Sequence, residues 1–145
     1  MTLNVMLDKG AKMPTRSYKR DMGLDLYCKE GENRYSVEIP PRGSYIFDTG
    51  VHVEIPYGYG GYIDPRSGLL TKDDIFTAGD IDSGYTVSIR VKLFNLSPNK
   101  PYIVCPGDKI AQLVIVHLGM PELVLVDHFA KTERSDNGFG STGVR

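Results

Sequence analysis

Two short segments carry residue types that could bind or process a phosphorylated ligand. The first is Pro65-Arg66-Ser67-Gly68, which offers a cation, a hydroxyl group and an unhindered stretch of backbone. Arginine can bind two phosphate oxygens at once, and a glycine lets the main chain approach an anion closely. This tetrapeptide is therefore a candidate phosphate contact, although four residues alone do not specify one.

The second segment covers residues 81–85 and places the carboxylate of Asp82 and the aromatic ring of Tyr85 at a turn. An alternating, strand-like segment follows directly, so both side chains are expected at the mouth of a hairpin. Spacing alone favours an ordinary polar turn here over a functional site.

The C-terminal tail, residues 134–145, is polar and rich in glycine, and residues 138–143 match the pattern G-x-G-x-x-G. Only Val144 and Arg145 follow the last glycine, so no helix can begin there and a Rossmann-type site is excluded. Glycines still allow backbone amides to approach an anion, and Ser141 and Thr142 add hydroxyl donors. A phosphate-wrapping tail and a disordered terminus remain equally open.

The composition argues against several classes of function. Seventeen Lys and Arg residues against 18 Asp and Glu give a formal net charge of −1, which does not suit a dedicated duplex-DNA or RNA binder. The histidines show no metal-ligand spacing, and Cys28 and Cys105 are too few for a four-ligand zinc site. We expect both cysteines to be reduced and to pack in the core, and any metal to arrive with the ligand.

Neither export nor membrane insertion is indicated by the sequence. Residues 1–20 contain no apolar run of secretory length, and no later stretch approaches about 18 uninterrupted apolar residues. The protein is expected to be intracellular, in the cytoplasm or, if it is viral, in the cytoplasm of the host cell.

Strand-forming patterns dominate the chain. Residues 87–93 alternate strictly, which predicts a half-buried strand with its odd-numbered residues facing inward. Residues 35–39 and 51–55 repeat the alternation, and a proline follows each. Residues 110–118 and 123–126 are almost continuously apolar, which predicts strands covered on both faces, at the centre of the fold or at a subunit contact.

Helical character is limited to residues 67–76, where a brief helix is predicted. Sixteen glycines and nine prolines interrupt the rest of the chain, and strand patterns recur every 8 to 15 residues or so. These features predict an all-β jelly-roll sandwich or barrel with at most one short helix. Residues 1–133 are expected to form this single domain, with residues 134–145 as a flexible C-terminal tail.

Five segments acquire meaning when they are read together, in the order residues 23–26, 65–69, 79–85, 107–113 and 134–143. This ordered set resembles the five signature blocks of the trimeric dUTPase family, and the resemblance runs from about residue 21 to the end of the chain. It implies a homotrimeric enzyme that hydrolyses dUTP to dUMP and pyrophosphate, with each active site built from three subunits. Such an enzyme limits uracil incorporation into DNA and supplies dUMP for dTMP synthesis.

The resemblance also implies roles for individual residues. Asp82 corresponds to the catalytic aspartate, which orients and deprotonates the water that attacks the α-phosphate. Asp25 corresponds to the residue that contacts the water shell of Mg²⁺, the cofactor, which is held mainly by the substrate phosphates. Tyr85 corresponds to the tyrosine that packs beneath the deoxyribose and leaves no room for a 2′-hydroxyl. Main-chain groups of the hairpin, Gly79 and Ile81 among them, would bind uracil.

The remaining binding residues implied by the resemblance divide between the phosphate site and the tail. The phosphate contacts correspond to Arg66, Ser67, Gly68 and Gln112. In the tail, Phe139 would stack on the uracil while the others, Arg134, Gly140, Ser141 and Thr142, would close over the phosphates as a lid.

The chain departs from the usual family pattern at several places, among them a slightly shorter segment between residues 67 and 82 and Asp73-Asp74, where histidine or glycine is frequent. Thr86-Val87-Ser88 follows the hairpin tyrosine, where a triplet containing glycine is usual. Asp80 adds a carboxylate two positions before the catalytic one, and Ser135-Asp136-Asn137 replaces a more glycine-rich run. The uracil pocket and the tail are therefore the places where this chain is expected to differ.

Two alternative functions remain open at this stage. A dCTP deaminase of the same superfamily would require a glutamate at about the position of Lys92, and a lysine cannot serve as that acid and base. A dUTP-binding regulatory protein with weak or no hydrolysis, acting on an unknown protein partner, would keep the same binding residues. Neither a nucleic acid nor a membrane is expected as a partner.

Overall fold

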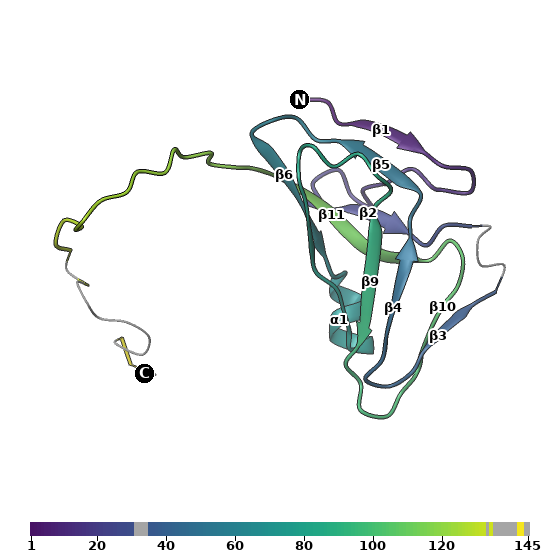
Figure 1. Cartoon of the computed structure of the whole chain (residues 1–145). Helices are drawn as coiled ribbons and strands as arrows, with labels where there is room; N and C mark the ends of the chain where they lie inside the picture. The colour runs from purple at the N-terminus through teal and green to yellow at the C-terminus, as the bar shows by residue number, and fades with distance from the viewer. Residues whose placement is uncertain (31–34, 133, 135–141, 144–145) are drawn as a thin grey trace.

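Strands make up most of the fold in the computed structural model, which describes residues 1–30, 35–132, 134 and 142–143 (Figure 1). Within those residues a single short helix interrupts the strands. In chain order the elements are β1 (Asn4–Leu7), β2 (Leu24–Tyr27), β3 (Val37–Ile39), β4 (Ser44–Asp48), β5 (Val51–Glu54), β6 (Tyr59–Asp64), α1 (Ser67–Asp73), β7 (Ile75–Phe76), β8 (Gly79–Ile81), β9 (Arg90–Asn95), β10 (Tyr102–Val104) and β11 (Lys109–His117). The predicted all-β jelly-roll class is confirmed.

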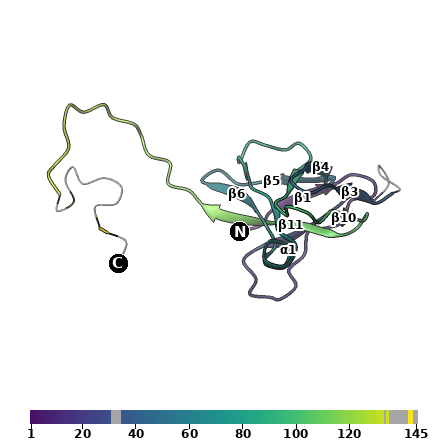
Figure 2. The ribbon, with the colours of Figure 1, turned by 90° about the horizontal axis from the view of Figure 1, so that it is seen from below.

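The largest sheet has the strand order β2-β11-β6-β8, and all its strand pairs are antiparallel. A second sheet has the order β4-β9-β7, and β1-β5 and β10-β3 form two-stranded pairs. The two views together place β4 on the opposite side of the core from β11 (Figures 1 and 2). The central position of β11 puts the first and fourth signature blocks on neighbouring strands, and the second block follows directly after β6 on its other side.

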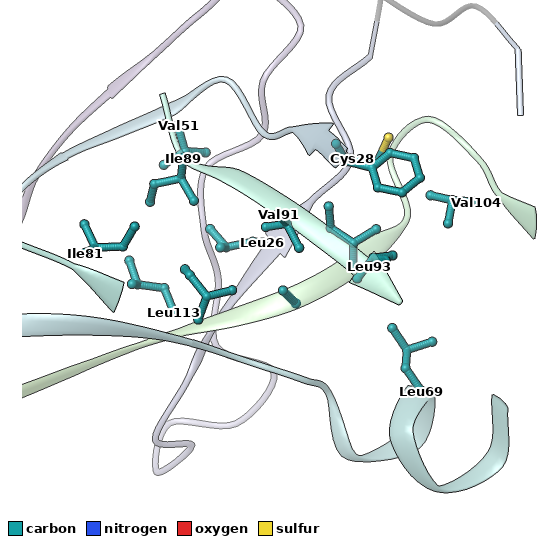
Figure 3. Close-up of a cluster of buried hydrophobic side chains, with 14 of the residues drawn as sticks. Leu26, Cys28, Val51, Leu69, Ile81, Ile89, Val91, Leu93, Val104 and Leu113 are labelled. Carbon is teal, nitrogen blue, oxygen red and sulfur yellow. The ribbon is translucent and has the colours of Figure 1, made fainter. Parts of the chain in front are cut away.

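The core fills the space between these sheets (Figure 3). Strand β9 alternates between exposed and buried residues, so that Val91 and Leu93 point inward. Leu26 from β2 and Leu113 from β11 meet them and are fully buried. Each such side chain stabilises the fold by about 1.5–3 kcal/mol relative to its exposed state.

Two of the predicted strands match closely, one is shorter and one is displaced. The patterns at residues 51–55 and 110–118 correspond to β5 and β11, whereas only the second half of residues 35–39 forms β3. The strand predicted over residues 87–93 begins only at Arg90, and Val87, expected inside, is 59% exposed. Residues 86–88 stay outside the ladder because side chains of neighbouring strands bind them instead, at the Thr86 carbonyl and the Ser88 hydroxyl.

The prediction of a strand at residues 123–126 is wrong. Beyond β11 the chain leaves the sheets as an extended segment (Figure 1), and the side chains of Leu123 and Leu125 are 91% and 100% exposed. An apolar run becomes a buried strand only where a neighbouring strand is available, and the chain by itself offers none here. The alternative of a subunit contact stays a prediction.

The predicted helix is present as α1 but is shorter than residues 67–76. It ends at Asp73, and the capping residue Asp74 adopts a left-handed conformation with φ 56° and so turns the chain back. The next residue, Ile75, is then buried in β7. Arg66 precedes the first turn, which places it beside β2 and β11. Within the described part of the chain, no helix has the length and apolar character needed to cross a membrane.

The two cysteines have different environments, and both are free thiols. Cys28 is buried in the core, as expected, and burial raises the pKa of its thiol above the ordinary value. Cys105 is exposed, with its Sγ 3.2 Å from the Ser36 hydroxyl. The expectation of core packing is therefore wrong for Cys105, because the residue lies in the turn that connects β10 to β11.

Candidate active site

The Asp25 carboxylate, on β2, is the centre of a cluster of charged and polar side chains. Its Oδ1 lies 3.1 Å from the Arg66 Nε, and its Oδ2 lies 2.7 Å from the Lys109 Nζ. The Ser17 hydroxyl donates a further hydrogen bond of 3.1 Å to Oδ2. Burial by itself would raise the pKa of Asp25, but the hydrogen bonds from Lys109 and Ser17 and the charge of Arg66 outweigh it and lower the pKa. Asp25 is thus held as a carboxylate.

A cleft of about 400 Å³ opens beside this carboxylate. Gln112 stands opposite Asp25 across β2 and β11, and its Nε2 donates to the Pro65 carbonyl at 3.1 Å. The cleft is lined by Ser17, Tyr18, Asp21, Met22, Gly23, Asp25, Arg66, Ser67, Gly68 and Gln112. Cationic, hydroxyl and amide donors thus converge on one hollow, which is the chemistry that binds phosphate oxygens.

Two glycines shape this cleft. A side chain at Gly23 would place its Cβ 2.1 Å from the Gln112 Oε1, so only glycine leaves Gln112 where it is. A Cβ at Gly68 would meet no atom within 4 Å, which leaves its backbone open to an approaching ligand.

The hairpin with Asp82 and Tyr85 lies at the end of β8. Gly79 and Ile81 pair with β6, and the buried side chain of Ile81 anchors the strand in the core. Asp82 is exposed just beyond it, and its carbonyl accepts a 3.0 Å hydrogen bond from the Tyr85 amide, which closes the turn. The Tyr85 hydroxyl donates to the Ser88 carbonyl at 3.2 Å. The structure thus brings the carboxylate and the ring to one turn, as expected.

This hairpin and the cleft lie at different levels of the same sheet. Gln112 pairs with Asp64, whereas Ile81 pairs with Gly61, so three residue steps of β6 separate the two levels. That separation is about 10 Å along the strand, and the two strand spacings from β11 to β8 add about 9–10 Å across it. Figure 3 shows Ile81 at the opposite end of the core from α1. Within one chain, Asp82 therefore lies outside the cleft.

Of the tail residues predicted to bind substrate, only Arg134 and Thr142 fall within the described part of the chain, and both are exposed. Phe139, Gly140 and Ser141 lie outside it, as does the departure at residues 135–137.

A family model accounts for almost the whole sequence, since the model of dUTPase matches residues 9–143. The chain belongs to the dUTPase family. It is 41% identical to the deoxyuridine 5′-triphosphate nucleotidohydrolases of Mycobacterium bovis and Mycobacterium tuberculosis over 147 aligned positions, which cover 96% of this chain and 92% of each relative. The resemblance drawn from the five sequence blocks is thereby confirmed.

Solved dUTPase structures share the fold. The dUTPase of Staphylococcus bacteriophage 80alpha with dUPNHPP matches with a TM-score of 0.88 and 33% identity, covering 99% of each chain. A variant dUTPase from phage phi11 of S. aureus matches with a TM-score of 0.80 and 31% identity, covering 89% of this chain and 99% of that one. The latter structure is described as revealing the coordination of a structural Mg(II) ion.

For a divalent cation, this dUTPase offers two carboxylates in the cleft, Asp21 and Asp25, without a cluster of three ligands among the described residues. Across residues 1–30, 35–132, 134 and 142–143, no three His, Cys, Asp or Glu side chains come together as a metal site. Mg²⁺ keeps several waters and is commonly bound through one or two carboxylates together with substrate phosphates. The cleft around Asp25 fits a Mg²⁺ ion that arrives with a triphosphate.

Sequence reasoning missed several residues of the cleft, and it missed Lys109, which pairs with Asp25 beside it. Lys109 lies within the fourth block, between Gly107 and Gln112, so its place in that block was a usable signal. Four others come from the loop that precedes β2, where no pattern in the sequence marks them: Ser17, Tyr18, Asp21 and Met22. Gly23 also lines the cleft; it stands in the first block, but the resemblance gave it no role.

Proposed function

We propose that this protein hydrolyses dUTP to dUMP and pyrophosphate, with Mg²⁺ bound to the triphosphate. The observation that carries the proposal is the cleft in which three separate sequence blocks meet: Asp25 from the first, Arg66 to Gly68 from the second and Gln112 from the fourth. In a member of the dUTPase family, such a cleft with cationic and hydroxyl donors suits the phosphates of the nucleotide.

In the proposed reaction Asp82 holds a water molecule in line with the α-phosphorus and accepts its proton. The water oxygen bonds to the α-phosphorus, the bond from that phosphorus to the bridging oxygen breaks, and pyrophosphate leaves. Carboxylates are weak bases near neutral pH, so most of the rate must come from positioning and charge neutralisation. Arg66 and Ser67 supply part of that neutralisation by contacting phosphate oxygens.

The cofactor in this proposal is Mg²⁺, which when bound offsets the negative charge on the phosphates. Asp25 would hold waters of its hydration shell from the side of the cleft. Because Lys109 and Arg66 keep Asp25 ionised, its oxygens remain acceptors for such waters.

The separation between Asp82 and the cleft supports an assembly in which subunits share their sites. A homotrimer would place the hairpin of one subunit against the cleft of a second, so that one nucleotide contacts both. The exposed apolar residues at 123–126 are suited to a contact between such subunits. A third subunit would contribute the tail.

The proposal also assigns the residues that bind the uracil base, those that contact the deoxyribose and those that form the lid. Main-chain groups of Gly79 and Ile81 would bind uracil, and the Tyr85 ring would lie under the deoxyribose and reject a 2′-hydroxyl. Residues 134–145 would close over the bound nucleotide, with Phe139 stacked on the base. The side chains that would close over the phosphates are Arg134, Ser141 and Thr142, with the backbone at Gly140. A free nucleotide as substrate and two free thiols fit an intracellular, cytoplasmic protein.

The deaminase alternative has no support at the position where it needs an acid and base. Lys92 is exposed on β9, and its Nζ lies 5.0 Å from the centroid of the Phe94 ring. No carboxylate replaces it at this position.

The test is pyrophosphate release from dUTP with Mg²⁺, measured beside dCTP, dTTP and UTP for the wild type and for Asp82→Asn. Selective cleavage of dUTP by the wild type, reduced about 100-fold or more in the variant, is the expected result, because a general base contributes that much to a rate. Tight binding of dUTP without release of pyrophosphate would instead favour the regulatory alternative. Unchanged turnover in Asp82→Asn would refute the role of Asp82.

A further inference from the structure

The segment that follows the substrate hairpin is held by side chains and not by a regular ladder. The Tyr85 hydroxyl donates to the Ser88 carbonyl at 3.2 Å, so the position of the ring depends on where residues 86–88 lie. The Ser88 hydroxyl in turn donates a hydrogen bond to the carboxylate of Asp48, at the end of β4. Regular pairing resumes only at Ile89, whose amide donates to the Val51 carbonyl at 2.8 Å.

His52, on β5, binds the same segment from its other end. Its Nδ1 lies 2.8 Å from the Thr86 carbonyl oxygen, and its Nε2 lies 3.2 Å from the Asp8 carboxylate. Both neighbours are acceptors, so both contacts are favourable only when both ring nitrogens carry a proton. The geometry therefore selects the imidazolium form of His52, whose side chain is only 17% exposed.

The charged groups around His52 join the two attachments into one network. Lys29 Nζ lies 3.6 Å from a carboxylate oxygen of Asp8 and 3.6 Å from one of Asp48. Glu54, two residues further along β5, accepts a 2.8 Å hydrogen bond from the Asn4 side chain instead. The Asp8 carboxylate thus binds the His52 ring, the Asp48 carboxylate binds the Ser88 hydroxyl, and the Lys29 ammonium lies between the two carboxylates.

We infer that His52 is a positioning residue for the substrate hairpin: by holding the Thr86 carbonyl it fixes the Tyr85 ring, and so it sets the affinity for dUTP and the rejection of UTP. This inference rests on the proposed function, because it uses the role of Tyr85 beneath the sugar. It also explains how the hairpin keeps its shape although Thr86-Val87-Ser88 lacks the usual glycine, since the side chains of His52 on β5 and Asp48 on β4 bind this segment.

The arrangement has a dependence on pH. The hydrogen bond with the Thr86 carbonyl raises the pKa of His52 most, burial lowers it in part, and Asp8 raises it further, so that the net shift is upward. A raised folded-state pKa means that this stabilisation is fully present below the ordinary value of about 6.5 and is lost as the pH rises through the raised pKa. A neutral imidazole keeps one N–H, which is best placed on Nε2 facing the charged Asp8 carboxylate, so that Nδ1 would present a lone pair to the Thr86 carbonyl and release it. The affinity for dUTP should therefore fall over that range.

The experiment compares two substitutions that separate the contacts of His52. Asn can place its amide nitrogen where Nδ1 stands and still donate to the Thr86 carbonyl, whereas Leu can donate to neither partner. Glu54→Gln is the matched control, because it changes a charge on the same strand but can keep its bond to Asn4. The probes are an imido analogue of dUTP with Mg²⁺ for calorimetric binding, and dUTP and UTP for steady-state rates.

We expect His52→Leu to weaken analogue binding about three- to tenfold, the effect of losing one hydrogen bond, and to reduce the preference for dUTP over UTP to a similar extent. The value of kcat should change less than twofold. His52→Asn should bind within about twofold of the wild type but lose the pH dependence, and Glu54→Gln should match the wild type. Unchanged binding and discrimination in His52→Leu would overturn the inference, and so would equal losses in the Leu and Asn variants.

Hydrogen exchange at the amides of residues 86–88 separates this inference from the proposed function. Faster exchange in His52→Leu, with normal exchange in His52→Asn and Glu54→Gln, supports the attachment even if the wild type fails to cleave dUTP. That failure would count against the hydrolysis alone. Equal exchange in all four proteins would overturn the attachment, whatever the activity.

Discussion

The ammonium group of Lys109 lies 2.7 Å from the Asp25 carboxylate, although Lys109 pairs with Tyr27 and not with Asp25 in the ladder of β11 and β2. Arg66 holds the other oxygen of the same carboxylate from the start of α1. The acidic residue of the first block is thus fixed by cations from the second and fourth blocks. One ionic cluster therefore links three blocks that are distant in the sequence.

Replacing Lys109 with Met should destabilise the fold and weaken substrate binding. The substitution keeps an unbranched, flexible side chain but removes the cation from the largely buried Oδ2 of Asp25, which retains its hydrogen bond from the Ser17 hydroxyl. We expect a loss of about 1–2 kcal/mol in the free energy of unfolding, because the lost hydrogen bond is charge-assisted and partly buried. Urea denaturation measures this loss, and the KM for dUTP should rise in the same variant.

Lys12→Met is the matched control for that experiment. Lys12 also approaches the Tyr27 ring, at 5.7 Å against 5.9 Å for Lys109, and it also pairs with a carboxylate, that of Glu30. Both members of the Lys12 pair are well exposed, so the control should stay within about 0.5 kcal/mol of the wild type. Equal losses of unfolding free energy in the two variants would mean that the pair of Lys109 and Asp25 stabilises the fold no more than the exposed pair does.

The same carboxylate should contribute to stability in a pH-dependent way. The pKa of Asp25 is lower in the folded protein than in the unfolded chain, because the hydrogen bonds of Lys109 and Ser17 and the charge of Arg66 outweigh the effect of burial. Its contribution is therefore present above the unfolded value of about 3.9 and is lost as the pH falls through the folded value. The difference in unfolding free energy between the wild type and Asp25→Asn should shrink as the pH falls from about 5 toward 3. A difference that stays constant over this range would contradict the shift.

The sequence contained enough information for the fold class and for several strands. The alternation at residues 51–55 predicts β5, because a strand buried on one face alternates between apolar and polar residues. The apolar run at residues 110–118 predicts β11, because a strand buried on both faces is apolar throughout. The pattern at residues 87–93 failed at Val87 for a physical reason. Bonds from His52 and Asp48 hold the preceding segment, and a pattern of hydrophobicity does not record such long-range side-chain bonds.

The candidate site was predictable only in part. The resemblance assigned Asp25, Arg66 and Gln112 to one function, and the structure places all three in one cleft. It did not identify Lys109 as a partner of Asp25, because that pairing depends on the register of β2 and β11. Nor could the apolar run at residues 123–126 be distinguished from a core strand, since an apolar pattern does not show whether a neighbouring strand is available.

Gly23→Ala should damage the phosphate cleft without unfolding the protein. The new methyl group would lie 2.1 Å from the Gln112 Oε1, so that side chain must move and release the Pro65 carbonyl. We expect the value of kcat/KM for dUTP to fall about tenfold or more, because Gln112 then no longer presents its amide in the cleft. Gly119→Ala is the control, since a Cβ there meets nothing within 4 Å. Full activity in Gly23→Ala would show that Gln112 does not have to stand where it does.

Removal of residues 135–145 should leave the folded domain intact and abolish most of the turnover. Among the described residues, the buried core ends at Val114, so the truncation removes none of it. If the tail closes over the bound nucleotide, its loss admits water and weakens each charged interaction in the site. We expect kcat/KM for dUTP to fall about 100-fold, with an unchanged oligomeric state by light scattering.

Phe139→Ala separates the two contributions of the tail in that experiment. It removes only the ring proposed to stack on uracil, so the KM for dUTP should rise by the equivalent of about 1–3 kcal/mol, with a smaller change in kcat. The residues proposed to close over the phosphates stay in place in this variant. Full activity in the truncated protein would refute the lid, whereas a loss confined to the truncated protein would mean that the tail acts through its phosphate contacts and not through stacking.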